Sequence, residues 1–172
     1  MAANASPVTM NTICTSARVV ARFLISLQGE DGMNAHTLTN MRLQKILYFA
    51  QGFALGSIGI PLFDDPFHAL PYGPVCLDIY GMLKQYRNGQ IPMKEGCGYI
   101  QSLVKTFNIV EYLRVVMKWA NQLSTPDLVR RSHIKDSPWE KVWSPDSAFN
   151  TRPYNEIPQD VMKVYFSKFF HS

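Results

Sequence analysis

Residues with the chemistry of catalysis are sparse in this sequence of 172 residues, and none of them forms a recognised catalytic motif. The histidines His36, His68, His133 and His171 do not pair with one another or with a cysteine at the spacing of zinc ligands. Phosphate-binding glycine loops, the Gly-x-Ser-x-Gly turn and the His-Glu-x-x-His motif are all missing from the sequence. We therefore expect no catalytic residue, no metal site and no cofactor.

Cys76 and His68 make the best case for an enzyme. They lie eight residues apart in the sequence, where a loop is expected to meet a helix, and His133 could join them. A histidine that lowers the pKa of a cysteine creates a thiolate nucleophile. No local motif supports this arrangement, and a small buried thiol is the simpler interpretation. A Cys/His enzyme therefore remains the least favoured of three hypotheses.

Two charged clusters have similarly simple explanations. Asp64 and Asp65 could act as an acid–base pair or bind a metal, but adjacent acids before a proline are typical of a solvated turn. Arg130, Arg131 and Lys135 could meet a phosphate or an acidic partner, although a solvated helix end also explains them. This basic cluster supports the second hypothesis, a nucleic-acid-associated protein of a phage or mobile element.

The most informative polar residues fall on one face of an expected central helix. Gln44, Tyr48 and Gln51 are spaced at i, i+4 and i+7, with Lys45 beside them. The neighbouring positions are nearly all apolar, so these side chains must find hydrogen-bond partners in a largely buried helix. Two interpretations are equally supported. The side chains bond the 60–73 segment and stabilise the fold, or they form the floor of a groove that binds a partner.

The segment Tyr72-Gly73-Pro74-Val75 carries the same ambiguity. Gly73 could simply supply a turn geometry. Pro74 suits the first position of a helix, where its missing N–H costs nothing, and the helix would offer its free N–H groups to an acidic group.

His133 and Pro138-Trp139 form a third candidate group. The aromatic rings could stack on a ligand, although a tryptophan in such a place more often packs in the core. Ser137 before Pro138, with Glu140 three residues after the serine, is typical of a helix start.

The elements that position these residues are predicted to be mainly helical, because apolar residues recur with a period near 3.6. Residues 60–72 are expected to form a small hairpin or an extended loop, because Pro61 and Pro66 weaken strand pairing. The expected fold is mainly α, a single compact helical domain of about six or seven helices with at most one small β-hairpin. Residues 1–11 are expected to be a flexible leader and 12–172 the domain. The predicted helices are 12–28 (capped by Thr15 or Ser16), 39–55 (capped by Thr39), one opening at Pro74, 102–122 with a break near Asn108, 125–131, one from Ser137 and one from Pro158.

Two details of these helices can be tested directly. Gly56 and Gly59 are expected to end the helix that begins after Thr39. The last helix is expected to bury an apolar side, made of Val161, Val164, Tyr165, Phe169 and Phe170.

The composition limits the compartment and the partners. Hydrophobic residues make up 47% and charged residues 17%, which indicates a folded domain with a less polar surface than usual. The net charge of +4 favours acidic partners, but no run of Lys or Arg marks a nucleic-acid or membrane-binding segment. Cys14, Cys76 and Cys97 indicate reduced thiols. No membrane span and no signal peptide is predicted, so the expected location is the cytoplasm.

Four short motifs follow one another along the chain. They are Leu43-Gln44-Lys45-Ile46-Leu47-Tyr48-Phe49-Ala50-Gln51 after Leu38-Thr39-Asn40; Pro61-Leu62-Phe63, Ala69 and Tyr72-Gly73-Pro74-Val75 with Tyr80; His133 with Pro138-Trp139; and Ile157-Pro158 with Tyr165-Phe166. In this order they resemble the motifs of the Panacea (SocA-like) antitoxin domain family. With the leading helix they span residues 12 to 170, nearly the whole chain. The family has an acid and a tryptophan around the alanine of the second motif, whereas this chain has His68 and Leu70.

The resemblance implies a cytoplasmic, often phage-associated antitoxin that is not an enzyme. Such a module neutralises a cognate toxin by direct binding, or acts as an adaptor that presents the toxin to a protease or chaperone. Its oligomeric state is open. The residues expected to bind the partner or to define the fold are Gln44, Lys45, Tyr48, Gln51, His68, Tyr72, Gly73, Pro74, His133, Pro138 and Trp139.

Overall fold

The computed structural model describes residues 12–13, 16–102, 106–143 and 155–171. Within these ranges the chain forms seven α-helices and one small antiparallel sheet, which confirms the predicted mainly α fold. The leader at 1–11, Cys14, Thr15 and most of the Ser/Pro-rich segment after Trp143 lie outside the described residues. The helices are α1 Ala17–Ser26, α2 Asn40–Ile58, α3 Leu77–Leu83, α4 Ile109–Asn121, α5 Thr125–Ser132, α6 Pro138–Val142 and α7 Gln159–Ser167; short 3-10 turns occur at Leu27–Gly29, Lys84–Tyr86 and Met93–Glu95.

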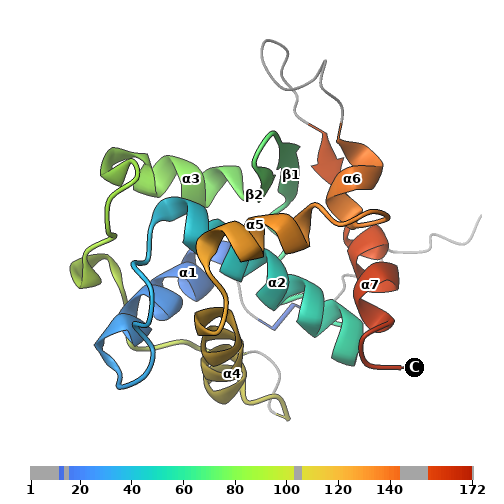
Figure 1. Cartoon of the computed structure of the whole chain (residues 1–172). Helices are drawn as coiled ribbons and strands as arrows, with labels where there is room; N and C mark the ends of the chain where they lie inside the picture. Colours follow the sequence, from blue (N-terminus) through green and yellow to red (C-terminus); the bar gives the residue numbers. More distant parts are fainter. Residues whose placement is uncertain (1–11, 14–15, 103–105, 144–154, 172) are drawn as a thin grey trace, which may run out of the picture.

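Helix α2 crosses the middle of the molecule, with α1, α3, α4, α5 and α7 around it (Figure 1). Thr39 caps its start by accepting a hydrogen bond from the backbone N–H of Arg42, as predicted. It ends at Gly59, whose φ of 73° lies in the left-handed region that favours glycine. Most of its side chains are buried on every side, so this helix organises the core.

The prediction that Gly56 helps to end α2 was wrong, because Gly56 lies inside the helix at a close contact with α7. A Cβ atom on Gly56 would come within 2.5 Å of the backbone carbonyl carbon of Phe166. A Cβ atom on Gly52, one turn earlier, would come within 2.3 Å of the Phe166 ring. The two glycines therefore serve the approach of two helices, a role that the local sequence does not distinguish from helix termination.

The sheet has three short strands, β1 Phe67–Leu70, β2 Gly73–Val75 and β3 Glu156–Ile157. Their order is β2-β1-β3, and both pairs are antiparallel. The hairpin predicted for residues 60–72 exists, but it joins 67–70 to 73–75 rather than to 60–63. The third strand makes the sheet one strand larger than the predicted hairpin.

Pro74 lies in strand β2, so the prediction that it opens a helix was wrong. It pairs with Ala69, whose N–H points away from β2 and donates to the carbonyl of Asn155 at 2.8 Å. A position opposite such a residue needs no donor, so proline is tolerated there. Helix α3 begins three residues later, with Cys76 at the N-cap.

The caps predicted at Ser16 and Ser137 are confirmed, and the structure adds caps at the predicted break near Asn108 and at the predicted helix start after Ser124. Ser16 caps α1 and Asn108 caps α4 at the predicted break. Ser124 and Asp127 form a capping box at α5, and Ser137 caps α6. These interactions span three residues, which is why the sequence alone reveals them.

The predicted buried side of α7 was wrong. The buried residues are Met162 and Phe166, whereas Val164 is 61% exposed and Phe169 is 59% exposed. All faces of this helix carry apolar residues, so periodicity could not identify the side that packs against α2.

Replacing Gly56 with Ala should destabilise the protein by about 1–3 kcal/mol, because the added methyl overlaps the Phe166 backbone. The gain in helix propensity, about 1 kcal/mol, offsets only part of this cost. The free energy of unfolding from urea denaturation measures the effect.

Gly81→Ala is the matched control, because Gly81 also lies in a helix but no heavy atom lies within 4 Å of the position that its Cβ would take. It should stabilise the protein by about 0.5–1 kcal/mol. Similar changes in both variants would contradict the close packing of α2 and α7.

Candidate functional site

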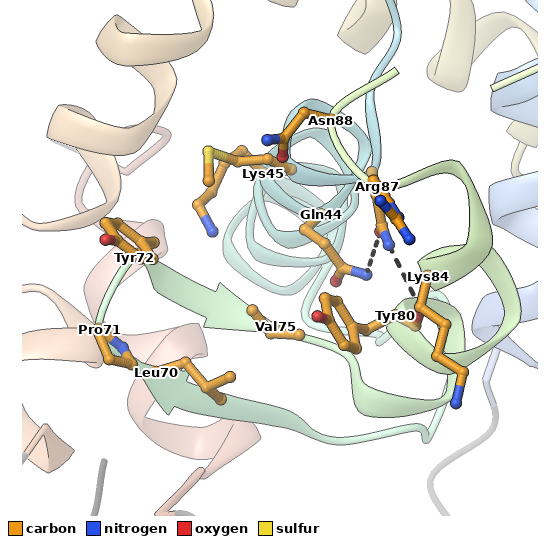
Figure 2. A pocket seen from close by; sticks show the side chains of 12 residues that line it. Gln44, Lys45, Leu70, Pro71, Tyr72, Val75, Tyr80, Lys84, Arg87 and Asn88 are labelled. Atoms are coloured by element: carbon orange, nitrogen blue, oxygen red, sulfur yellow. Dashed lines mark hydrogen bonds between the residues drawn. The ribbon is translucent and has the colours of Figure 1, made fainter. Parts of the chain in front are cut away.

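A pocket of about 410 Å³ opens between α2, the β1–β2 hairpin, α3 and the loop that follows α3 (Figure 2). Figure 2 shows Leu70, Pro71 and Tyr72 at one end and Tyr80, Lys84 and Arg87 at the other. Gln44 and Lys45 reach it from the buried helix. The other lining residues are Asn40, Met41, Val75 and Asn88.

Gln44 holds the strand that leads into α3. Its side-chain Oε1 accepts a hydrogen bond from the backbone N–H of Cys76 at 2.8 Å, and its Nε2 donates to the Cys76 carbonyl at 3.4 Å. The same Nε2 donates to Oδ1 of Asn40 at 3.3 Å. Gln44 thus satisfies buried backbone groups and lines the pocket at the same time.

Lys45 places a buried ammonium group behind the hairpin. The residue is 1% exposed, and its Nζ donates to the carbonyl of Pro74 at 3.0 Å. Burial disfavours the charged form and lowers the pKa of Lys45 to about 7. Among the described residues no carboxylate forms an ion pair with it.

Tyr48 and Gln51, the other residues of the stripe, lie in the interior and do not line the pocket. Gln51 accepts from the N–H of Leu62 and donates to the carbonyl of Phe63, both at 2.8 Å. The Tyr48 ring meets Phe67 edge to face, and its hydroxyl has no partner among the described residues. Burial raises the pKa of Tyr48 well above its usual value. Both side chains therefore contact the protein interior rather than the pocket.

The hairpin turn is held from three directions. Gly73 has a φ of 103°, and a Cβ there would come within 2.9 Å of the Lys45 Cε and 2.8 Å of the Ser132 Oγ. The indole N–H of Trp139 donates to the Leu70 carbonyl at 2.8 Å. These contacts leave the backbone of the turn little freedom.

His133 and Trp139 pack on each other, with ring centroids 4.0 Å apart. His133 Nε2 lies 3.4 Å from the Pro71 carbonyl, and Nδ1 lies 2.6 Å from that of Val129. Pro138 is buried, and Trp139 also stacks on Trp143. These predicted site residues therefore support the hairpin from behind and do not line the pocket.

His68 and Cys76 do not have the surroundings of a nucleophile and its base. Cys76 is buried, and burial raises the pKa of its thiol to about 11, so the reactive thiolate is disfavoured. His68 lies on β1 with its Nδ1 buried and without a partner among the described residues, and burial lowers its pKa.

The charged clusters have local explanations where the structure describes them. Asp65 accepts a hydrogen bond from the N–H of Ala17 at the start of α1. Arg130 pairs with Asp127 at 2.6 Å, whereas Arg131 and Lys135 are exposed. In the described ranges no three His, Cys, Asp or Glu side chains could hold a metal ion, and no helix is long and apolar enough to cross a membrane.

Sequence reasoning missed the residues at the far end of the pocket. Tyr80 was noted only as part of a motif, and Lys84 and Arg87 were not singled out. The only signal was that Tyr80, Lys84 and Arg87 follow one another at four and three residues, the spacing of one helical face. Arg87 has a φ of 49° and a ψ of −120°, a conformation that few residues other than glycine adopt.

The fold and its pocket define a mainly α protein built around one buried helix that also forms the floor of a surface site. The sequence matches the family model described as Antitoxin SocA-like, Panacea domain over residues 43–140, more than half of the chain. The curated protein Antitoxin SocA of Caulobacter vibrioides (strain NA1000 / CB15N) is 29% identical over 143 residues, which cover 79% of this chain and 74% of that protein. No solved structure matches significantly. The chain belongs to the SocA-like Panacea antitoxin domain family, which confirms the resemblance.

Lys45 should make stability depend on pH in a way that Lys45→Met removes. Its folded-state pKa of about 7 lies below the unfolded value, so above pH 7 the unfolded chain holds a proton that the folded chain has released. The free energy of unfolding should therefore rise between pH 7 and 8.5, by roughly 1–2 kcal/mol. Urea denaturation at several pH values measures it.

The comparison uses the difference between wild type and Lys45→Met at each pH, because all other titrating groups are shared. Below pH 8.5 the raised pKa values of Cys76 and Tyr48 add little. A constant difference across this range would show that Lys45 keeps its proton in the folded protein.

Proposed function

We propose that this protein is an antitoxin that neutralises a partner toxin by direct binding through the face around the pocket. The observation that carries the proposal is the pair of tyrosines at the two ends of the pocket. Tyr72 is 69% exposed and Tyr80 is 50% exposed. Exposed tyrosines beside a concave site are typical anchors of protein interfaces.

The braced hairpin supports this role because it presents Tyr72 on a rigid support. Side chains of α2, α5 and α6 already hold Gly73 and its neighbours, so little conformational entropy is lost when a partner binds. A toxin bound here could not use the covered part of its surface to reach its target. The mechanism is occlusion, and the proposed action is non-catalytic and cytoplasmic.

An adaptor that presents the toxin to a protease is the second candidate. An adaptor needs a second surface besides the one that holds the toxin. The exposed apolar residues of the α7 end, Val164, Phe169 and Phe170, lie away from the pocket lining and could meet a protease or chaperone. The pocket would hold the toxin in both candidates. A nucleic-acid role has weaker support, because Arg130 is paired with Asp127.

We expect the toxin to be encoded beside this gene, and the pair of proteins provides the test. Co-expression of the wild-type protein should restore growth, and the two proteins should co-purify. The double substitution Tyr72→Ser and Tyr80→Ser should weaken binding at least about tenfold, because interface tyrosines contribute about 1–2 kcal/mol or more each. Isothermal titration calorimetry on the purified pair measures the change.

Tyr99→Ser is the matched control, since Tyr99 is 73% exposed and lies outside the pocket lining. It should leave the affinity unchanged. A neighbouring protein that neither associates nor is counteracted would refute the antitoxin proposal. Wild-type affinity in the double variant would refute only the placement of the interface.

A further inference from the structure

The charges around the pocket are all of one sign. Three of its lining residues are cations, Lys45, Lys84 and Arg87, and none is Asp or Glu. The ion pairs formed among the described residues, Arg18–Asp78, Arg114–Glu30 and Arg130–Asp127, leave these three cations out. The pocket therefore has a positive potential that the surrounding protein does not neutralise, and it favours an anionic group.

Lys45 gives this site a buried donor. An ammonium group has three N–H donors, and the hydrogen bond to the Pro74 carbonyl uses one of them. A buried cation without a counter-ion is costly, and an anion that enters the pocket offsets this cost. The depressed pKa of Lys45, about 7, agrees with such an uncompensated position.

Most of the uncharged lining is apolar or aromatic, and Asn40, Gln44 and Asn88 add polar groups. Leu70, Pro71 and Val75 form the hairpin side, and Tyr72 and Tyr80 stand at the two ends. A volume of about 410 Å³ is in the range of sites that hold a small ligand or a few side chains. The occupant must therefore combine an anionic group with an apolar or aromatic one.

We propose that the pocket binds a carboxylate of the protein partner together with a neighbouring aromatic side chain, the carboxylate lying over Lys45 at the floor beside the hairpin. This inference rests on the proposed function and names the chemistry that the partner must bring. The carboxylate can belong to an Asp or Glu side chain or to a chain terminus. Arg87 and Lys84 are exposed and steer the acid, whereas Lys45 receives it at the floor.

A protein fits these observations better than a nucleic acid does. Nucleic-acid binding needs a positive groove or stripe that follows several phosphates. Here three cations line a small pocket, Lys45 beside the hairpin and Lys84 and Arg87 at the far end, and they do not form such a stripe. The charge of the whole chain, +4, is also modest.

Three capped dipeptides that differ only in their charged group test the inference on the full chain. Acetyl-Phe-Asp amide carries a side-chain carboxylate, acetyl-Phe-Asn acid carries a terminal carboxylate, and acetyl-Phe-Asn amide carries none. NMR follows the Lys45 ¹³Cε resonance, assigned by its loss in Lys45→Met, together with the amides of the pocket lining. At least one of the acids should bind at least about tenfold tighter than the neutral amide. The tighter acid identifies the source of the carboxylate.

The bound acid should also raise the pKa of Lys45 by at least about one unit, which a merely structural lysine would not show. Lys84→Gln and Arg87→Gln should together weaken binding of the acid at least about tenfold and leave the amide unaffected. These residues are exposed, so the fold should tolerate both changes. Lys94→Gln is the control, because Lys94 is an exposed cation outside the pocket.

Three outcomes would overturn the inference. The three peptides could bind with equal affinity. Alternatively, none of them could shift the NMR resonances of the pocket at concentrations up to the solubility limit of the peptides. A short single-stranded oligonucleotide that displaced the acids at low concentration would assign the site to nucleic acid, and inorganic phosphate that did so would assign it to a phosphate group. If the peptides fail while the toxin still co-purifies, only the carboxylate inference is lost. If the acids bind while no toxin associates, the pocket chemistry stands and the proposed function fails.

Discussion

The structure depends on the hydrogen bonds that buried side chains of α2 make to the irregular backbone of residues 62–76. Gln51 bonds the N–H of Leu62 and the carbonyl of Phe63, Gln44 bonds both backbone groups of Cys76, and Lys45 bonds the Pro74 carbonyl. Backbone groups that are buried without a partner cost several kcal/mol each in an apolar medium, so this segment could not lie in the core without these side chains.

The same helix stabilises its other neighbours by different means. Arg42, 1% exposed, donates to the carbonyls of Ala120 and Leu123 at the end of α4, where backbone acceptors lack helical partners. Gly52 and Gly56 let α7 approach. One helix therefore positions the hairpin, α4 and α7. This explains why so much of its surface is buried and why its buried polar residues have structural roles.

The fold and the candidate site share residues of α2. Gln44 and Lys45 line the pocket and also hold the hairpin, so a loss of binding after their substitution has two possible causes. The pocket rim is different, because the exposed side chains of Tyr72, Tyr80 and Lys84 carry little of the packing. Substitutions at the rim can consequently change which partner is recognised, while the floor of the pocket keeps its structure.

Local sequence was sufficient for the helical class, for the caps at Thr39 and Ser137, and for the family motifs, because those depend on contacts within a few residues. It also identified Gln44 and Gln51 as buried polar groups that need partners. It could not show that Pro74 lies in a strand or that Gly56 sits inside a helix, since each depends on a neighbour far along the chain. The end of the pocket that carries Lys84 and Arg87 could not be predicted for the same reason. Lys84 and Arg87 become part of a site only when folding brings α3 and its loop against α2, and an interaction between distant segments leaves no periodic trace in either one.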